Sequence, residues 1–156
     1  MNKDSDGEPI SENPDKLHWN LVHNPTTIGE VLHELCDVLP VFLLERLAEH
    51  RHAEPHTLVK LSMHQDSDVR AAVTGNSKTP EDVLSYMLKD DSPDVRYTMA
   101  ENHNLPMELL ETLCEDENPY VSSRAQKTIV RLRTNKCVEG QFAYGEIYEE
   151  RILEGL

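Results

Sequence analysis

The sequence has no apolar run of 18 residues, which argues against a membrane-spanning helix. Its first residues also lack the basic stretch and apolar run of a secretory signal, so we expect a cytoplasmic protein. A glycine-rich phosphate loop and a nucleophile elbow are both missing. These absences give no positive support for catalysis or for a cofactor, and the sequence predicts a protein that is not an enzyme.

Positive charge is also scarce, because 15 Lys and Arg residues face 29 Asp and Glu residues, for a net charge of −14. Nucleic-acid binding depends on neutralising phosphates with basic side chains, so this balance argues against nucleic acid. It argues equally against anionic membrane surfaces. Two interpretations stay open. The acidity serves solubility, or it attracts a protein partner with a basic surface.

The three cysteines include no Cys-x-x-Cys pair, so neither a zinc site nor a redox dithiol is indicated. We expect Cys36 and Cys114 to be small buried residues and Cys137 to lie outside the repeats described next. The cluster His50, His52 and His56 has a spacing at which imidazoles bind zinc or nickel. No further ligand is obvious near it, so the cluster is only a weak candidate for a metal site.

The most informative feature present is a repeat with a period of 26 residues. Asp68-Val69-Arg70 recurs as Asp94-Val95-Arg96. At this period four columns of apolar residues align: Leu17, Leu43, Val69, Val95 and Val121; Leu21, Leu47, Val73, Met99 and Ala125; Leu32, Leu58, Leu84 and Leu110; Leu35, Leu61, Met87 and Leu113. A fixed period in this range is typical of solenoids, whose units bury their apolar faces against their neighbours.

Within each unit the apolar residues recur at i, i+3 and i+4, which predicts two short helices of about ten residues. In one unit Thr79 and Ser92 are expected to cap helices that begin at Pro80 and Pro93. The sequence therefore predicts an all-α solenoid of about four helix-pair repeats, with an N-terminal half repeat at 13–24. Residues 1–12 are expected to form a disordered acidic tail, 13–134 the repeat domain, and 135–156 a C-terminal extension.

The segments 73–84 and 99–110 resemble the leucine-rich repeat variant, and the runs 66–70 and 91–96 resemble the second helix of HEAT repeats. The resemblance covers about residues 13–128. It implies a right-handed superhelix of helix pairs whose second helix is short and partly 3₁₀. The chain departs from the variant in its longer period, and the cysteine-rich iron–sulfur segment of that family has no counterpart here.

Two polar columns accompany the repeat. Asn24, His50, Asn76 and Asn102 are expected to end the second helices, with left-handed backbone at Asn102, and to bond open backbone groups. Arg70 and Arg96 either brace a turn through acidic neighbours such as Asp66, Asp68, Asp91 or Asp94, or present an exposed stripe to a partner. The brace is the favoured interpretation.

A solenoid usually offers a surface rather than a pocket, so the sequence favours a protein-interaction module, that is, an adaptor or regulator. The second helices would line its groove, and Tyr and Arg commonly anchor interfaces. The candidate binding residues are Arg70, Arg96, Tyr97, Tyr120 and Arg124. The alternatives are an enzyme or lyase on a HEAT-like scaffold, as in families related to bilin attachment, or a metal or iron–sulfur protein.

The C-terminal region departs from the repeat, because the helical pattern after Pro119 continues to Arg133. It carries basic residues and no acidic ones, whereas the following residues are rich in glutamate and contain Phe142, Tyr144 and Tyr148. Two interpretations stay open for this tail. It caps the last repeat, with its carboxylates against the basic helix, or it docks on another protein.

Overall fold

The computed structural model describes residues 14–138, and every regular element in that range is an α-helix. The bounds of the helices are α1 Pro14–His23, α2 Gly29–Leu35, α3 Val41–Ala48, α4 Pro55–Ser62, α5 Ser67–Thr74, α6 Glu81–Met87, α7 Pro93–Glu101, α8 Met107–Leu113 and α9 Pro119–Val138. The prediction of an all-α protein is confirmed for this part of the chain. The predicted acidic tail, residues 1–12, and the tail aromatics Phe142, Tyr144 and Tyr148 lie outside the described residues.

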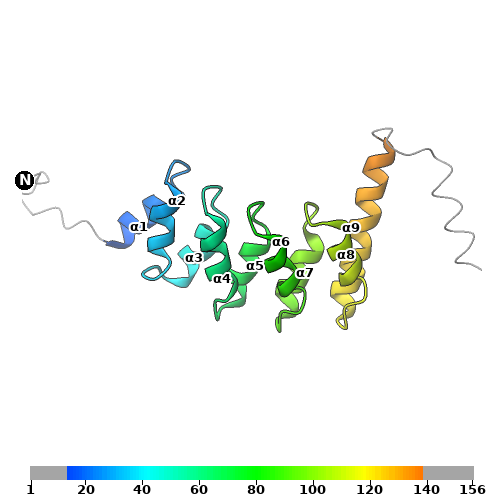
Figure 1. Cartoon of the computed structure of the whole chain (residues 1–156). Coiled ribbons are helices and arrows are strands. Elements are labelled where there is room, and N and C mark those ends of the chain that lie inside the picture. The colour runs from blue at the N-terminus through cyan, green and yellow to red at the C-terminus, as the bar shows by residue number, and fades with distance from the viewer. Residues whose placement is uncertain (1–13, 139–156) are drawn as a thin grey trace, which may run out of the picture. The chain divides into compact units, whose positions relative to one another are not determined.

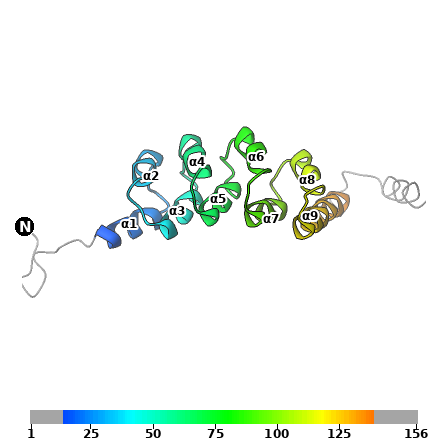
Figure 2. The ribbon, with the colours of Figure 1, turned by 90° about the horizontal axis from the view of Figure 1, so that it is seen from below.

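The chain divides into two compact units at Met87 and Leu88. In the first unit the helices form two layers (Figures 1 and 2), with α1, α3 and α5 in one and α2, α4 and α6 in the other. Contacts run within each layer, as between α3 and α5 or α4 and α6, and across the layers, as between α3 and α4. In the second unit α9 packs against both α7 and α8, and α7 also contacts α8.

The four predicted apolar columns form the core of these units. Leu43, Val69, Val95 and Val121 are at most 1% exposed, and the other columns supply Leu47, Val73, Met99, Leu32, Leu58 and Leu110 at 0%. The prediction is wrong at Leu17, which is 44% exposed, and holds only in part at Leu21, which is partly exposed. Leu17 lies on α1, the first described helix, where the described residues provide no preceding helix to cover it.

Two of the second helices, α5 and α7, begin with side-chain caps: Asp66 accepts a hydrogen bond from the amide of Asp68, and Ser92 accepts one from the amide of Asp94. Pro93 then occupies the first turn of α7, as predicted. The second helix α3 begins after Pro40 without such a cap. Thr79 is not a cap, because its hydroxyl donates to the carbonyl of Val73 at 2.6 Å and so ties the end of α5 to the next turn. Thr27 makes the same bond to the carbonyl of Leu21 two periods earlier.

The predicted asparagine column joins successive turns. The side-chain amide of Asn76 donates to the carbonyls of Ala48 and His50, at 2.7 and 3.1 Å, and its oxygen accepts the amide of Lys78. Its expected role in satisfying open backbone groups is confirmed. The backbone at Asn102, with φ −73° and ψ 107°, is extended rather than left-handed, so that part of the prediction is wrong. There the side chain accepts the amide of Asn104 and closes the turn without unusual backbone.

Most of these helices have seven to nine residues and are slightly shorter than predicted. The second helices α3, α5 and α7 are α-helical, with no 3₁₀ segment in the described range. The exception in length is α9, with 20 residues, which confirms the predicted continuation beyond Pro119. Cys36 is buried, as predicted, whereas Cys114 is partly exposed, so the prediction is wrong there. Burial raises the pKa of both thiols.

Candidate binding surface

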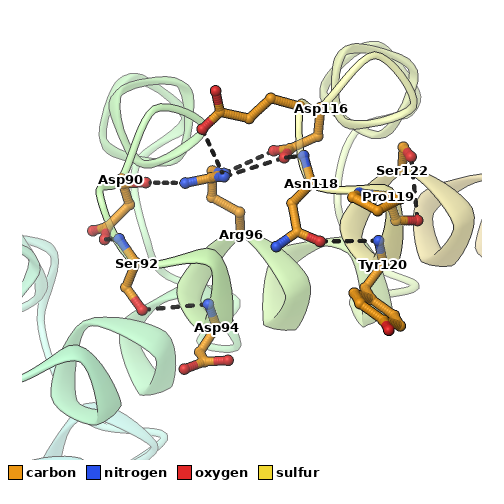
Figure 3. A network of polar contacts seen from close by, with 10 residues as sticks. Asp90, Ser92, Asp94, Arg96, Asp116, Asn118, Pro119, Tyr120 and Ser122 are labelled. Atoms are coloured by element: carbon orange, nitrogen blue, oxygen red, sulfur yellow. Dashed lines mark hydrogen bonds and ion pairs between the residues drawn. The ribbon is translucent and has the colours of Figure 1, made fainter.

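Arg96, on α7, lies at the centre of a buried polar network (Figure 3). Its Nε and Nη2 bond the two carboxylate oxygens of Asp116, at 2.7 and 3.2 Å, and Nη1 donates to the carbonyl of Asp90. The side chain of Arg96 is 9% exposed and that of Asp116 is 6% exposed, so both charges are largely shielded from water. Such a two-point contact fixes the guanidinium in the plane of the carboxylate.

The network shifts the pKa of both partners towards the charged form. The hydrogen bond with Asp116 raises the pKa of Arg96 against the opposing effect of burial. Burial alone would raise the pKa of Asp116, but hydrogen bonds from Arg96 and from the amide of Asn118 lower it further than burial raises it. Both shifts favour the charged forms and therefore the ion pair between Arg96 and Asp116.

The arginine column braces the turn that precedes its own helix. Arg70 donates from Nη1 to the carbonyls of His64 and Gln65, at 2.8 and 2.9 Å. Arg96 reaches the carbonyl of Asp90, which is also six residues earlier. The arginines thus brace the turn as predicted, but these bonds run to backbone carbonyls and not to the acidic side chains that were expected. The main partner of Arg96 is Asp116, however, and it was not among the acidic neighbours named from the sequence.

The sequence carried a signal for Asp116 that the arginine pattern alone did not use. His64, Asp90 and Asp116 share one position of the 26-residue period, and each accepts the amide two residues ahead. A carboxylate at this position therefore closes its own turn. It also lies beside an arginine, which belongs to the same 26-residue repeat for Asp90 and to the preceding repeat for Asp116.

An open hollow of about 430 Å³ lies over this network. Its lining is mostly charged and comprises Leu88, Lys89, Asp90, Asp91, Arg96, Asp116 and Glu117. The two central groups, Arg96 and Asp116, already use their bonding capacity on each other and on the backbone. Arg96 and Asp116 therefore form a structural ion pair at the base of the hollow, and they are not arranged as an acid and a base for proton transfer.

Arg96 cannot belong to the predicted binding surface, because it is only 7% exposed. Its predicted place in an exposed stripe is therefore wrong. Tyr120 is 77% exposed at the start of α9, and Tyr97 is partly exposed on α7. Arg124 is partly exposed and pairs with Glu101 of α7, with Nη2 and Oε1 2.9 Å apart.

These side chains define one face of the second unit. Helices α7 and α9 run in the same direction (Figure 1) and are joined by the Arg124–Glu101 ion pair. Tyr97 lies four residues before Glu101, and Tyr120 lies four residues before Arg124. Residues four apart share one side of a helix, so both tyrosines lie on the side of the ion pair. We call Tyr97, Glu101, Tyr120 and Arg124 the α7–α9 face.

The histidine cluster is occupied by hydrogen bonds. Nδ1 of His50 accepts the amide of His52, so its proton is on Nε2, which donates to the carbonyl of Asn24 at 3.0 Å. His52 faces the carbonyl of Thr27 through Nδ1 and accepts from Arg51 through Nε2. His56 stands apart, edge-on to His33 and 3.4 Å from Glu54. Within the described residues no three His, Cys, Asp or Glu side chains are grouped to hold a metal.

Sequence reasoning did not single out an exposed apolar group in the first unit. Phe42 and Val41 begin α3, Val38 precedes them, and Met63 follows α4; they are 56, 39, 61 and 75% exposed. These residues lie in or next to the loops between α2 and α3 and between α4 and α5, each of which connects the first helix of a pair to the second. The signal available was the absence of charge from 38–44, in a chain that is otherwise highly charged.

Comparison with known proteins adds no relative: no family model, no curated protein and no solved structure matches the chain. The resemblance to leucine-rich repeat variant and HEAT units therefore stays a prediction. In the part of the chain that the structure describes, no helix is both long and apolar enough to cross a membrane.

Proposed function

We propose that the chain is a non-catalytic protein-interaction module, an adaptor or regulator, built as a right-handed solenoid of 26-residue helix pairs. The sequence period and the helix layers within the first unit support this arrangement. The observation that carries the functional proposal is the α7–α9 face. There a tyrosine exposed by 77% stands on the same side as a second tyrosine and the Arg124–Glu101 ion pair.

The chemistry of this face suits protein recognition. Tyr and Arg are enriched among residues that contribute most to binding, because they combine apolar area with polar groups at low conformational cost. The ordered Arg124–Glu101 pair keeps two of these side chains in place before a partner arrives. The net charge of −14 favours a partner with a basic surface by accelerating encounter, while the tyrosines contribute the affinity.

The test compares what the immobilised full-length chain captures from an extract of its native cells. The baits are the natural chain, the double variant Tyr97→Ala/Tyr120→Ala, and the control Tyr86→Ala. Tyr86 lies on α6 and is 73% exposed, so it matches Tyr120 in chemistry and exposure but not in position. Arg70 and Arg96 stay unchanged because they brace turns.

We expect quantitative mass spectrometry to show at least one protein that the natural chain and the control both capture. The double variant should capture it at least about tenfold less, since two anchoring side chains are lost. Measured affinities of the purified pair should fall by a similar factor and weaken with added salt. Equal capture by all three baits would show that the α7–α9 face is not the binding surface.

A further inference from the structure

The outer side of α9 carries two cations around an exposed apolar side chain. Lys127, Val130 and Arg131 are all exposed, with Val130 at 63%, and their spacing of three and four residues places them on one side of the helix. Neither cation forms an ion pair or a side-chain hydrogen bond with another described residue. Val130 therefore stands exposed between two cations, and no described residue packs over it.

Other cations of α9 do have partners, so the contrast is local. Arg124 pairs with Glu101 of α7, and Arg133 lies 3.6 Å from Glu111 of α8. The apolar side of the same helix is buried through Val121, Ala125 and Ile129. The side of Lys127, Val130 and Arg131 is thus the one that α7 and α8 leave uncovered, and we call these three residues the outer α9 face.

We propose that the chain's own segment 139–156 docks on the outer α9 face. The segment has the complementary composition. It carries Glu139, Glu146, Glu149, Glu150 and Glu154 against a single Arg151, and its apolar side chains include Phe142, Tyr144, Ile147, Tyr148, Ile152 and Leu153. Across 119–138, by contrast, α9 has five basic residues and no acidic one. Charge and apolar contact both favour the pairing.

The geometry of the tether allows it. Val130 lies eight residues before the end of α9, a distance of about 12 Å along the helix axis. The 18 residues that follow can span up to about 60 Å when extended, so any part of the segment can reach back. A short tether also gives an effective concentration in the millimolar range, which favours a contact too weak to form between separate molecules.

Charge also favours the chain's own segment over a second copy of the chain as the occupant of this face. Two copies that met through this face would bring together two molecules with a net charge of −14 each. The segment reaches the same face without that repulsion, because it is already part of the molecule. This inference is independent of the binding proposed for the α7–α9 face.

The test uses the full-length chain with isotope labelling and nuclear Overhauser contacts between the methyl groups of Val130 and the rings of Phe142, Tyr144 and Tyr148. We expect at least one such contact in the natural chain. The double variant Lys127→Glu/Arg131→Glu should lose at least half of its intensity. Adding Glu149→Lys/Glu150→Lys to that variant should restore the contact by exchanging the charges. The control Arg46→Glu/Lys78→Glu makes the same change in net charge in the first unit and should leave the contact intact.

Three results would overturn the proposal. One is the absence of any contact between Val130 and the three rings in the natural chain. Another is a contact seen only between labelled and unlabelled molecules in a mixed sample, which would assign the face to a second copy. The third is loss of the contact in the Arg46→Glu/Lys78→Glu control as well, because the effect would then follow net charge and not the face.

Discussion

The Arg96–Asp116 pair is the buried ion pair whose loss we expect to destabilise the fold strongly. Removing one partner of a buried ion pair leaves the other charge without compensation in a poorly solvated place. For Asp116→Asn we expect the free energy of unfolding to fall by about 3–5 kcal/mol, because the guanidinium stays buried while the carboxylate is lost. Urea unfolding followed by circular dichroism measures this.

Glu117 provides the matched control. It also contacts Arg96, at 3.6 Å, but its side chain is 90% exposed. Glu117→Gln should therefore cost less than about 1 kcal/mol, as is usual for exposed pairs. If the two variants unfold at the same urea concentration, burial does not set the strength of this contact.

The same pair makes stability depend on acid. The pKa of Asp116 is lower in the folded protein than its ordinary value of 3.8, so the folded state favours the ionised carboxyl. The resulting stabilisation is fully present well above pH 3.8 and is lost as pH falls through the lowered pKa of the folded protein. Urea midpoints between pH 2 and 7 should fall more steeply for the natural chain than for Asp116→Asn. Parallel curves would contradict the assignment.

Asn76 connects two turns through its side chain and makes a second test at this scale. Asn76→Ala removes both bonds to the carbonyls of Ala48 and His50. The carbonyl of His50 still accepts the amide of Ala53, so the main loss is the short bond to Ala48. We expect a loss of about 1–3 kcal/mol in unfolding free energy. Asn104→Ala is the comparison, since Asn104 is exposed and uses only its backbone amide, and it should stay within about 0.5 kcal/mol. A similar loss in both variants would contradict the structural role that we assign to the asparagine column.

At the scale of the helix, the apolar columns could be predicted because each helix must bury one side, and a residue that recurs at a fixed period meets the same surroundings. The rule fails where the surroundings change. Leu17 belongs to the column by sequence but lies on the first described helix. The polar details failed for another reason: a hydroxyl such as that of Thr79 has several acceptors within reach, and only the folded backbone decides among them. The partner of Arg96 was missed because Asp116 comes from the following 26-residue repeat.

This difference predicts unequal effects of the same substitution. Leu47, on α3, is completely buried, whereas Leu17, on α1, is 44% exposed. Leu47→Ala should lower the free energy of unfolding by about 2–5 kcal/mol, the usual range for a leucine that leaves a cavity. Leu17→Ala should cost well under half of that. Denaturant unfolding of both variants measures the contrast, and equal losses would show that α1 is covered in solution by another part of the chain.

At the scale of the whole molecule, the repeat crosses the boundary between the two units. The apolar columns continue from Val69 to Val95 and from Leu84 to Leu110 without a change of spacing. A repeat that continues through a boundary is the expected sequence of a solenoid whose neighbouring rungs stabilise one another. The proposed solenoid therefore predicts that the two units stabilise each other and unfold cooperatively. The helix positions within each unit do not by themselves imply this.

Native-state hydrogen exchange provides the test. Leu58→Ala empties a fully buried site on α4 and should destabilise the first unit by about 2–5 kcal/mol. If rungs stack across Met87 and Leu88, the amides of α7 lose part of that protection and should exchange at least about tenfold faster, a change of 1.4 kcal/mol. Leu17→Ala, the exposed leucine, should leave α7 unchanged. If Leu58→Ala accelerates exchange in α3 to α6 and leaves α7 as protected as before, the two units fold independently and the continuous solenoid is wrong. The alternative would then be two small helical domains that share a repeated sequence but not a common core.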